Sequence, residues 1–131
     1  MGWLLDTNIC IAFLNGGEPA LRDRLIALPV ADVHLCSVVK AELLYGARNG
    51  TRVDENVRTL ERFFEPFTSL PFDDEGAAHY GILRSQLKRE GRPIGANDLL
   101  IASIALAHDT VLVTRNDDEF RRVAGLRVET W

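Results

Sequence analysis

Acidic residues of this 131-residue chain stand where short apolar runs end or where apolar helices begin. Asp6 directly follows the run Trp3-Leu4-Leu5, which predicts a buried strand with a carboxylate at its carboxyl end. Glu42 interrupts a mainly apolar stretch, and Asp98 opens the most apolar segment of the chain. Carboxylates in such surroundings are rarely buried without a partner, so these three positions need a chemical explanation.

Each of the three acids also has an ordinary structural interpretation. Asp6 is a good N-cap for a helix that begins near Thr7. Asp98 would interact favourably with a helix N-terminus, by about 0.3–1 kcal/mol. Glu42 can lie at a helix edge with its carboxylate in water, and the acidic run 73–75 is interpreted as solvated charge in a first helical turn.

A polar loop after the apolar run Val111–Val113 contains further candidates. Asn116 and Asp117 both stand a few residues beyond that run, and either can be a fourth member of the group. Asp118 and Glu119 are interpreted differently, as polar residues that cap a short final helix.

The combination of these acids indicates a cation site. Carboxylates about 4 Å apart repel by about 4 kcal/mol per pair at an effective dielectric constant of 20, so a cluster persists only with bound cations. Oxygen ligands without histidine or cysteine suit Mg²⁺ or Mn²⁺. Such ions bridge phosphate oxygens and activate water for in-line attack.

Alternating strands and helices must bring these residues together. Apolar runs predict strands at 2–5, 33–36, 68–72 and 111–113, with an edge strand at 126–128. Caps and apolar spacing predict helices at 8–14, 19–28, 38–47 (with Ser37 as its N-cap), 54–64, 73–90 and 97–108. This order predicts an α/β fold, a single-domain (1–131) three-layer α/β/α sandwich around a mostly parallel sheet. Ligands bind at the carboxyl ends of such strands.

Composition excludes several function classes. Apolar residues make up 47% of the chain and charged residues 26%, which excludes a disordered protein. The formal charge of −4 does not suit nucleic-acid binding by bulk charge, so local cations or a metal would be needed. Cys10 and Cys36 form no disulfide framework or metal-ligand spacing. Without a membrane-length apolar run or signal-peptide pattern, we expect a cytoplasmic protein with no membrane partner.

The candidate residues lie in segments that resemble the PIN domains of bacterial and archaeal VapC toxins. One such segment would mean little, but together they span the chain at matching spacing. The matching segments are Leu5-Asp6-Thr7-Asn8, Ser37-Val38-Val39-Lys40-Ala41-Glu42-Leu43 with Tyr45-Gly46-Ala47, Gly95-Ala96-Asn97-Asp98-Leu99-Leu100-Ile101-Ala102, Val113-Thr114-Arg115-Asn116 with Phe120, and Leu126-Arg127-Val128-Glu129-Thr130-Trp131.

The resemblance implies the toxin of a type II toxin–antitoxin system, a Mg²⁺-dependent endoribonuclease acting on tRNA or ribosomal RNA. Asp6, Glu42 and Asp98 match the family's acidic positions, and Asn116 is the best match to the fourth. The resemblance also implies a homodimer and a small VapB-type antitoxin, whose Arg or Lys would enter the carboxylate cluster and displace the metal.

On this hypothesis, Asp6 and Asp98 hold the metal ion. Glu42 orients or deprotonates the attacking water, or helps to hold a second ion. Asn116 or Asp117 completes the polar ring.

Supporting roles are expected for neighbouring polar residues. Thr7 and Thr114 are predicted to donate hydrogen bonds to the ligand carboxylates. The candidates for contacts with RNA phosphates are Arg48, Arg52, Arg92 and Arg115.

Two other function classes stay open at this point. A phosphoryl-accepting receiver-type domain has a similar length and fold, but it needs paired acids after its first strand and a late Lys. Here Asp6 stands alone, and Val111–Val113 leads to Arg115. A non-catalytic protein-binding module would use the apolar helices at 20–28 and 54–64 as its interface.

Overall fold

One parallel β-sheet forms the centre of the protein in the computed structural model, which describes residues 2–131. Its strand order is β3-β2-β1-β4-β5, and every neighbouring pair is parallel. The predicted α/β class with a mostly parallel sheet is therefore confirmed. The strands are β1 (Trp3–Leu5), β2 (Val33–Cys36), β3 (Thr68–Leu70), β4 (Val111–Val113) and β5 (Val128–Glu129).

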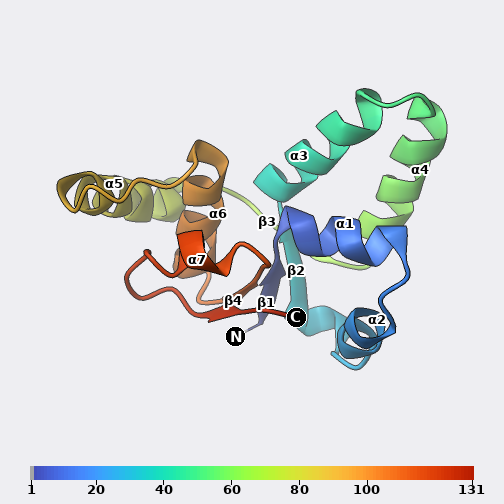
Figure 1. Ribbon diagram of the computed structural model, residues 1–131, viewed down its shortest axis with the longest axis horizontal. Coiled ribbons are helices and arrows are strands. Elements are labelled where there is room, and N and C mark those ends of the chain that lie inside the picture. Colours follow the sequence, from blue (N-terminus) through green and yellow to red (C-terminus); the bar gives the residue numbers. More distant parts are fainter. Residues whose placement is uncertain (1) are drawn as a thin grey trace.

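Helices cover both faces of the sheet, which gives the predicted three layers. Figure 1 shows α5 and α6 on one side of the sheet and α1 to α4 on the other. None of the helices within residues 2–131 is long and apolar enough to cross a membrane. The helices are α1 (Thr7–Asn15), α2 (Pro19–Ile26), α3 (Ser37–Arg48), α4 (Val53–Phe64), α5 (Asp74–Arg89), α6 (Ala96–Ala107) and α7 (Asp117–Phe120).

Most predicted boundaries lie within one residue of those in the structure, but the helix predicted at 19–28 ends at Ile26 and the strand predicted at 68–72 ends at Leu70. Two further boundaries are wrong for reasons that the structure shows. Ser37 is the first residue of α3 and not its cap, because the chain passes directly from β2 into the helix with Cys36 in the cap position. The edge strand begins at Val128 and not at Leu126, since Val128 is the residue that pairs with Leu112. The acidic run 73–75 is exposed, as predicted, and its first residue also caps α5.

The core lies on both sides of β1, the central strand. Leu4 and Leu5 are fully buried. So are Ile101 and Ile104 of α6, the helix whose nearly all-apolar sequence predicts burial. The side chains of Leu99 and of residues 101–105 are buried, and their packing fixes the rotation of α6 and with it the direction of the polar side chains in its first turn.

The carboxyl edge of the sheet gathers the starts of several helices. α1 follows β1, and α3 follows β2, so both begin at this edge. α6 begins here too, because it leads back to the amino end of β4. Segments far apart in sequence therefore meet at the crevice where ligands bind in parallel sheets.

Candidate active site

Asp6 lies at the end of β1 with both carboxylate oxygens hydrogen-bonded. Oδ1 accepts the backbone N–H of Thr7 at 2.8 Å, and Oδ2 accepts the hydroxyl of Thr114 at 2.7 Å. Burial raises the pKa of Asp6, these two hydrogen bonds lower it, and the charges of Glu42 and Glu119 raise it further, with a net rise. Asp6 can therefore be both the predicted N-cap of α1 and a predicted site residue. Its Oδ1 caps the helix, and its Oδ2 is held by Thr114.

Glu42 is half-buried in the second turn of α3 and points toward Asp6 and Thr7. The Thr7 hydroxyl donates to Glu42 Oε1 at 2.7 Å, so Thr114 donates to one of the carboxylates predicted to hold the metal, whereas Thr7 donates to the carboxylate predicted to act on the water. Glu42 and Thr7 line an open hollow of about 700 Å³ between α3 and α6, together with Asn97. The solvated helix-edge interpretation of Glu42 therefore describes only part of its surroundings.

Asp98 lies in the first turn of α6, and its Oδ2 accepts a hydrogen bond from Asn116 Nδ2 at 3.2 Å. Its pKa is raised to about 7 by burial first, then by the charges of Asp6 and Glu119, by a hydrogen bond with Glu119, and by the charge of Glu42. Burial is thus the largest cause of the raised pKa, and the three carboxylates that add to it are the nearby like charges.

The loop after β4 presents Asn116 to this group and turns Asp117 away. Besides contacting Asp98, Asn116 Nδ2 donates to Glu119 Oε2 at 2.8 Å. Asp117 instead pairs with Arg121, one turn along, at 3.3 Å. The geometry therefore favours Asn116 over Asp117 for the fourth position.

Glu119 is the residue that sequence reasoning missed. The interpretation of Glu119 as a mere cap of the final helix is wrong, because its carboxylate contacts Asp98, Asn116 and the backbone N–H of Gly95. The available signal was the spacing from Asn116 to Glu119, three residues across a helix start, which puts both side chains on one face. Asp118 is exposed, as expected for a solvated residue of the helix.

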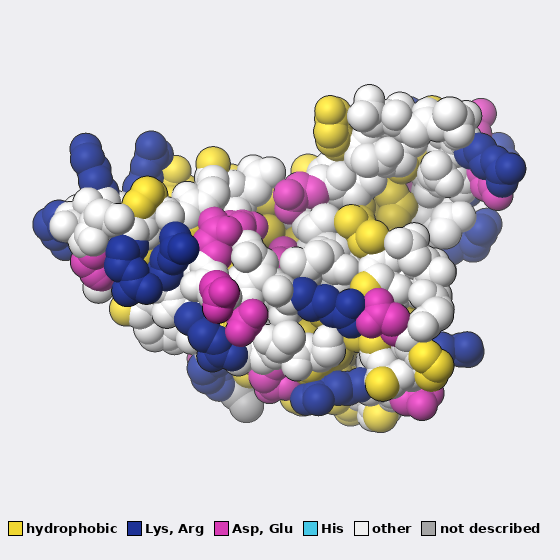
Figure 2. All heavy atoms as spheres, in the orientation of Figure 1, with side chains coloured by type: hydrophobic (Ala, Val, Ile, Leu, Met, Phe, Trp, Pro, Cys, Tyr) yellow, Lys and Arg dark blue, Asp and Glu magenta, His cyan; other side chains and the backbone are white. Residues whose placement is uncertain are grey.

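These carboxylates, Asp6, Glu42, Asp98 and Glu119, are called the acidic cluster below. Figure 2 shows acidic side chains gathered near the middle of the molecule, between the part built by α5 and α6 and the part built by α3 and α4. Within residues 2–131, neither Asp6, Glu42 nor Asp98 forms an ion pair with Lys or Arg. The repulsion among these three carboxylates is therefore not neutralised by an ion pair, whereas the charge of Arg122 acts on Glu119.

The donor set fits a hard divalent cation. All of the side-chain donors are oxygens, as Mg²⁺ and Mn²⁺ prefer. In the described part of the chain, no group of three or more acidic, histidine or cysteine side chains is arranged to hold a metal ion by itself. Mg²⁺ commonly binds through one or two carboxylates plus substrate phosphates, so a pair of these carboxylates is enough to fit it.

The four arginines proposed to contact RNA are placed differently from one another. Arg115 makes two hydrogen bonds to Glu18 and one to the Trp131 carbonyl, so its guanidinium is already engaged. Arg48 is the last residue of α3, Arg52 directly precedes α4, and Arg92 lies in the loop between α5 and α6. A role in RNA binding stays a prediction for all four.

Comparison with known proteins identifies the family of this arrangement. The family model of the PIN domain matches residues 3–126. The "tRNA(fMet)-specific endonuclease VapC" of Shigella flexneri is 37% identical over 98% of this chain and 97% of its own length. "Ribonuclease VapC2" of Rickettsia felis is 36% identical, over 100% of this chain and 98% of its own length. The chain belongs to the VapC family of PIN-domain proteins.

Solved VapC-family structures agree with the fold over its whole length. A crystal structure of VapBC2 from Rickettsia felis, bound to a DNA fragment from its promoter, superposes with a TM-score of 0.93 at 35% identity, covering 100% of this chain and 99% of that one. A crystal structure of DNA-bound VapBC from Salmonella typhimurium superposes with a TM-score of 0.94 at 34% identity, covering 100% of this chain and 98% of that one. VapC membership leaves the receiver-type alternative without support.

Proposed function

We propose that this protein is a divalent-metal-dependent endoribonuclease that serves as the toxin of a toxin–antitoxin pair. The observation that carries the proposal is the acidic cluster, whose charges meet at the carboxyl edge of the sheet without a cationic partner for Asp6, Glu42 or Asp98. The names of the VapC relatives, ribonuclease and tRNA(fMet)-specific endonuclease, support it.

Asp6 and Asp98 would hold Mg²⁺ or Mn²⁺, with Glu119 as an additional carboxylate beside Asp98. When bound, the ion supplies positive charge for the scissile phosphate and lowers the pKa of water, which makes a nucleophile available at neutral pH. Thr114 and Asn116 fix the directions of Asp6 and Asp98 through the hydrogen bonds described above.

Glu42 is the proposed base for the attacking water. Its Oε1 accepts a hydrogen bond from the Thr7 hydroxyl, and the Glu42 side chain lines the hollow between α3 and α6 that a strand of RNA would occupy. In the proposed reaction, water attacks phosphorus while its proton passes to Glu42. The phosphorus–oxygen bond to the leaving nucleoside breaks, and the leaving oxygen takes a proton from solvent.

RNA is the proposed substrate class, and initiator tRNA is the first member to test because the Shigella flexneri relative is named for it. Purified protein should cleave an initiator tRNA transcript with added Mg²⁺ and lose this activity in excess chelator. Mapping RNA 5′ ends after induction in cells should then give the target and the cut site. Undiminished cleavage in chelator would contradict the metal dependence.

Expression of the chain alone should stop growth, and Asp6→Asn should relieve this effect. Asn keeps the shape of the side chain but removes the charge that holds the ion. Equal toxicity of wild-type protein and Asp6→Asn at equal soluble levels would mean that Asp6 only caps α1.

A VapB-type antitoxin and a homodimer complete the proposal. The structural neighbours are VapBC assemblies by their titles, and this chain exposes the apolar side chains of Ile11, Ile26 and Tyr45 on its helices. An antitoxin Arg or Lys that entered the acidic cluster would supply the missing counter-charge and exclude the metal. Light scattering and co-purification with the product of the adjacent gene test both points, and a monomer without a partner would contradict them.

A further inference from the structure

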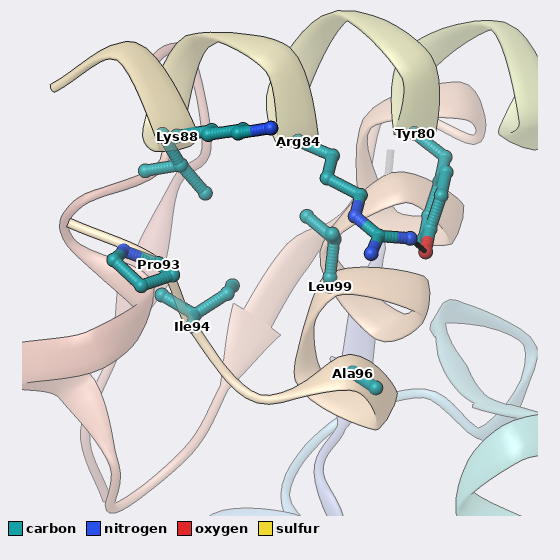
Figure 3. A pocket seen from close by; sticks show the side chains of 8 residues that line it. Tyr80, Arg84, Lys88, Pro93, Ile94, Ala96 and Leu99 are labelled. Atoms are coloured by element: carbon teal, nitrogen blue, oxygen red, sulfur yellow. Dashed lines mark hydrogen bonds between the residues drawn. The ribbon is translucent and has the colours of Figure 1, made fainter. Parts of the chain in front are cut away.

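A second hollow, separate from the acidic cluster, lies between α5 and the segment that leads into α6. Its volume is about 400 Å³, within the range typical of small-ligand sites. Figure 3 shows the α5 side chains of Tyr80, Arg84 and Lys88 on one side of it and the 93–99 segment on the other. Leu87, Ile94 and Leu99 make its lining largely apolar.

Two cations border this cavity without a carboxylate partner. Neither Arg84 nor Lys88 forms an ion pair within residues 2–131. Arg84 Nη1 donates instead to the hydroxyl of Tyr80 at 2.8 Å, with the guanidinium carbon 5.8 Å from the ring centroid. The spacing of four residues keeps all three side chains on one face of α5. In a chain of net charge −4, this is a place where an anion would be favoured.

The cavity and the acidic cluster lie on two sides of the same helical turn. Ala96 and Leu99 line the cavity, while Asp98, between them in sequence, faces Asn116. A helix with its side chains is roughly 10–12 Å across, a distance that about three stacked nucleotides span. A single RNA strand can therefore reach both places at once.

We propose that this cavity binds one nucleotide of the RNA substrate, with the base against Tyr80, Ile94 and Leu99 and a phosphate at Arg84 and Lys88. The inference rests on the proposed ribonuclease function. Aromatic rings and guanidinium planes stack on unpaired bases, and both cations bind phosphate. A protein partner that inserted an apolar side chain would leave both cations unpaired. A nucleotide would contact the apolar side chains with its base and the two cations with its phosphate.

The phosphate contact is tested with the double variant Arg84→Gln/Lys88→Gln. Its matched control is Arg58→Gln/Arg62→Gln, which removes the same charge at the same spacing from α4. With an initiator tRNA transcript, the α5 variant should lose about tenfold in kcat/KM, mainly through KM. Loss of one or two phosphate contacts should also flatten the slope of log affinity against log salt by about 0.7–1.4, whereas the control should keep the wild-type slope.

The base contact is tested with Tyr80→Leu and a single-stranded RNA oligomer that carries one abasic nucleotide at successive positions. In the wild-type protein, one abasic position should weaken binding by about tenfold or more. In Tyr80→Leu, an abasic nucleotide at that same position should cause no further loss of RNA binding.

The outcomes separate this inference from the function on which it rests. If wild-type protein cleaves RNA and the α5 variant behaves like the α4 control, the cavity is not an RNA subsite and the proposed function stands. If the α5 variant loses only dimerisation or antitoxin binding, the cavity is a protein contact and the inference is wrong. If wild-type protein cleaves no RNA, the proposed ribonuclease function is wrong, and the inference that rests on it is wrong as well.

Discussion

Thr114 donates its hydroxyl proton to Asp6 Oδ2 across 2.7 Å, although 108 positions separate the two residues in sequence. The same hydroxyl oxygen accepts the backbone N–H of Asn116 at 3.0 Å. One fully buried side chain at the end of β4 thus connects the carboxylate after β1 with the loop that carries the fourth polar residue. A hydroxyl in this position orients a metal ligand without contacting the metal itself.

Thr114→Val should therefore weaken metal binding while keeping the fold. Val has nearly the same shape but cannot donate to Asp6, so the affinity for Mn²⁺ by calorimetry should fall by about 10–100-fold. RNA cleavage should recover in part at high metal concentration. The control is Thr110→Val at the opposite end of β4, where the buried hydroxyl makes a long 3.4 Å contact with the Ala105 carbonyl. Equal metal affinity in the two variants would contradict the proposed role of Thr114.

Asn116→Ala should lower RNA cleavage at low Mg²⁺ and be partly rescued at high Mg²⁺. The reason is that the Asn116 amide contacts both Asp98 and Glu119 and so sets the distance between two carboxylates. Asp117→Ala is the neighbouring control and should have the smaller effect, because Asp117 pairs with Arg121. The reverse ranking in a metal titration would move the fourth position to Asp117.

Glu119→Gln should reduce metal affinity by about tenfold or more, as expected for loss of a supporting carboxylate. Asp118→Asn removes the same charge from the adjacent exposed position and should leave metal affinity unchanged. Calorimetry with Mn²⁺ measures both without requiring an RNA substrate. If the two variants bind metal equally well, Glu119 serves only to hold the Gly95 backbone.

The metal-free protein should become less stable as pH rises from about 4 to about 7. The pKa of Asp98 is about 7 in the folded chain against an ordinary value of 3.8, so the folded state holds this proton more tightly than the unfolded state. Its stabilising effect is complete below the unfolded pKa and is lost as the pH approaches the folded pKa. Thermal melting in chelator across this range measures the loss.

Asp98→Asn is the variant that isolates this effect. Without metal it should melt a few degrees above wild-type protein near about pH 8, because it removes one charge from a group of like charges. With saturating Mg²⁺, wild-type protein should melt above Asp98→Asn, since only the wild-type site is stabilised by binding the ion. A variant that melts below wild-type protein in chelator would show that repulsion in the acidic cluster costs no stability.

Local sequence signals were enough to predict the layers of this fold and three members of the acidic cluster. The apolar run Val33–Cys36 gives the bounds of β2, and the nearly all-apolar sequence of α6 predicts its burial. Asp6 and Asp98 could be selected because each stands beside such an element. These signals work because strand and helix periodicities depend on neighbouring residues alone.

Only the tertiary structure decided which polar side chains face one another at the carboxyl edge of the sheet. Glu119 joins the cluster because α7 is placed against the loop before α6, and Arg115 is engaged by Glu18 across 97 positions. The choice of Asn116 over Asp117 likewise depends on where α6 presents Asp98. Local spacing shows only that Asn116 and Glu119 share a face, because the direction of that face depends on packing between segments far apart in sequence.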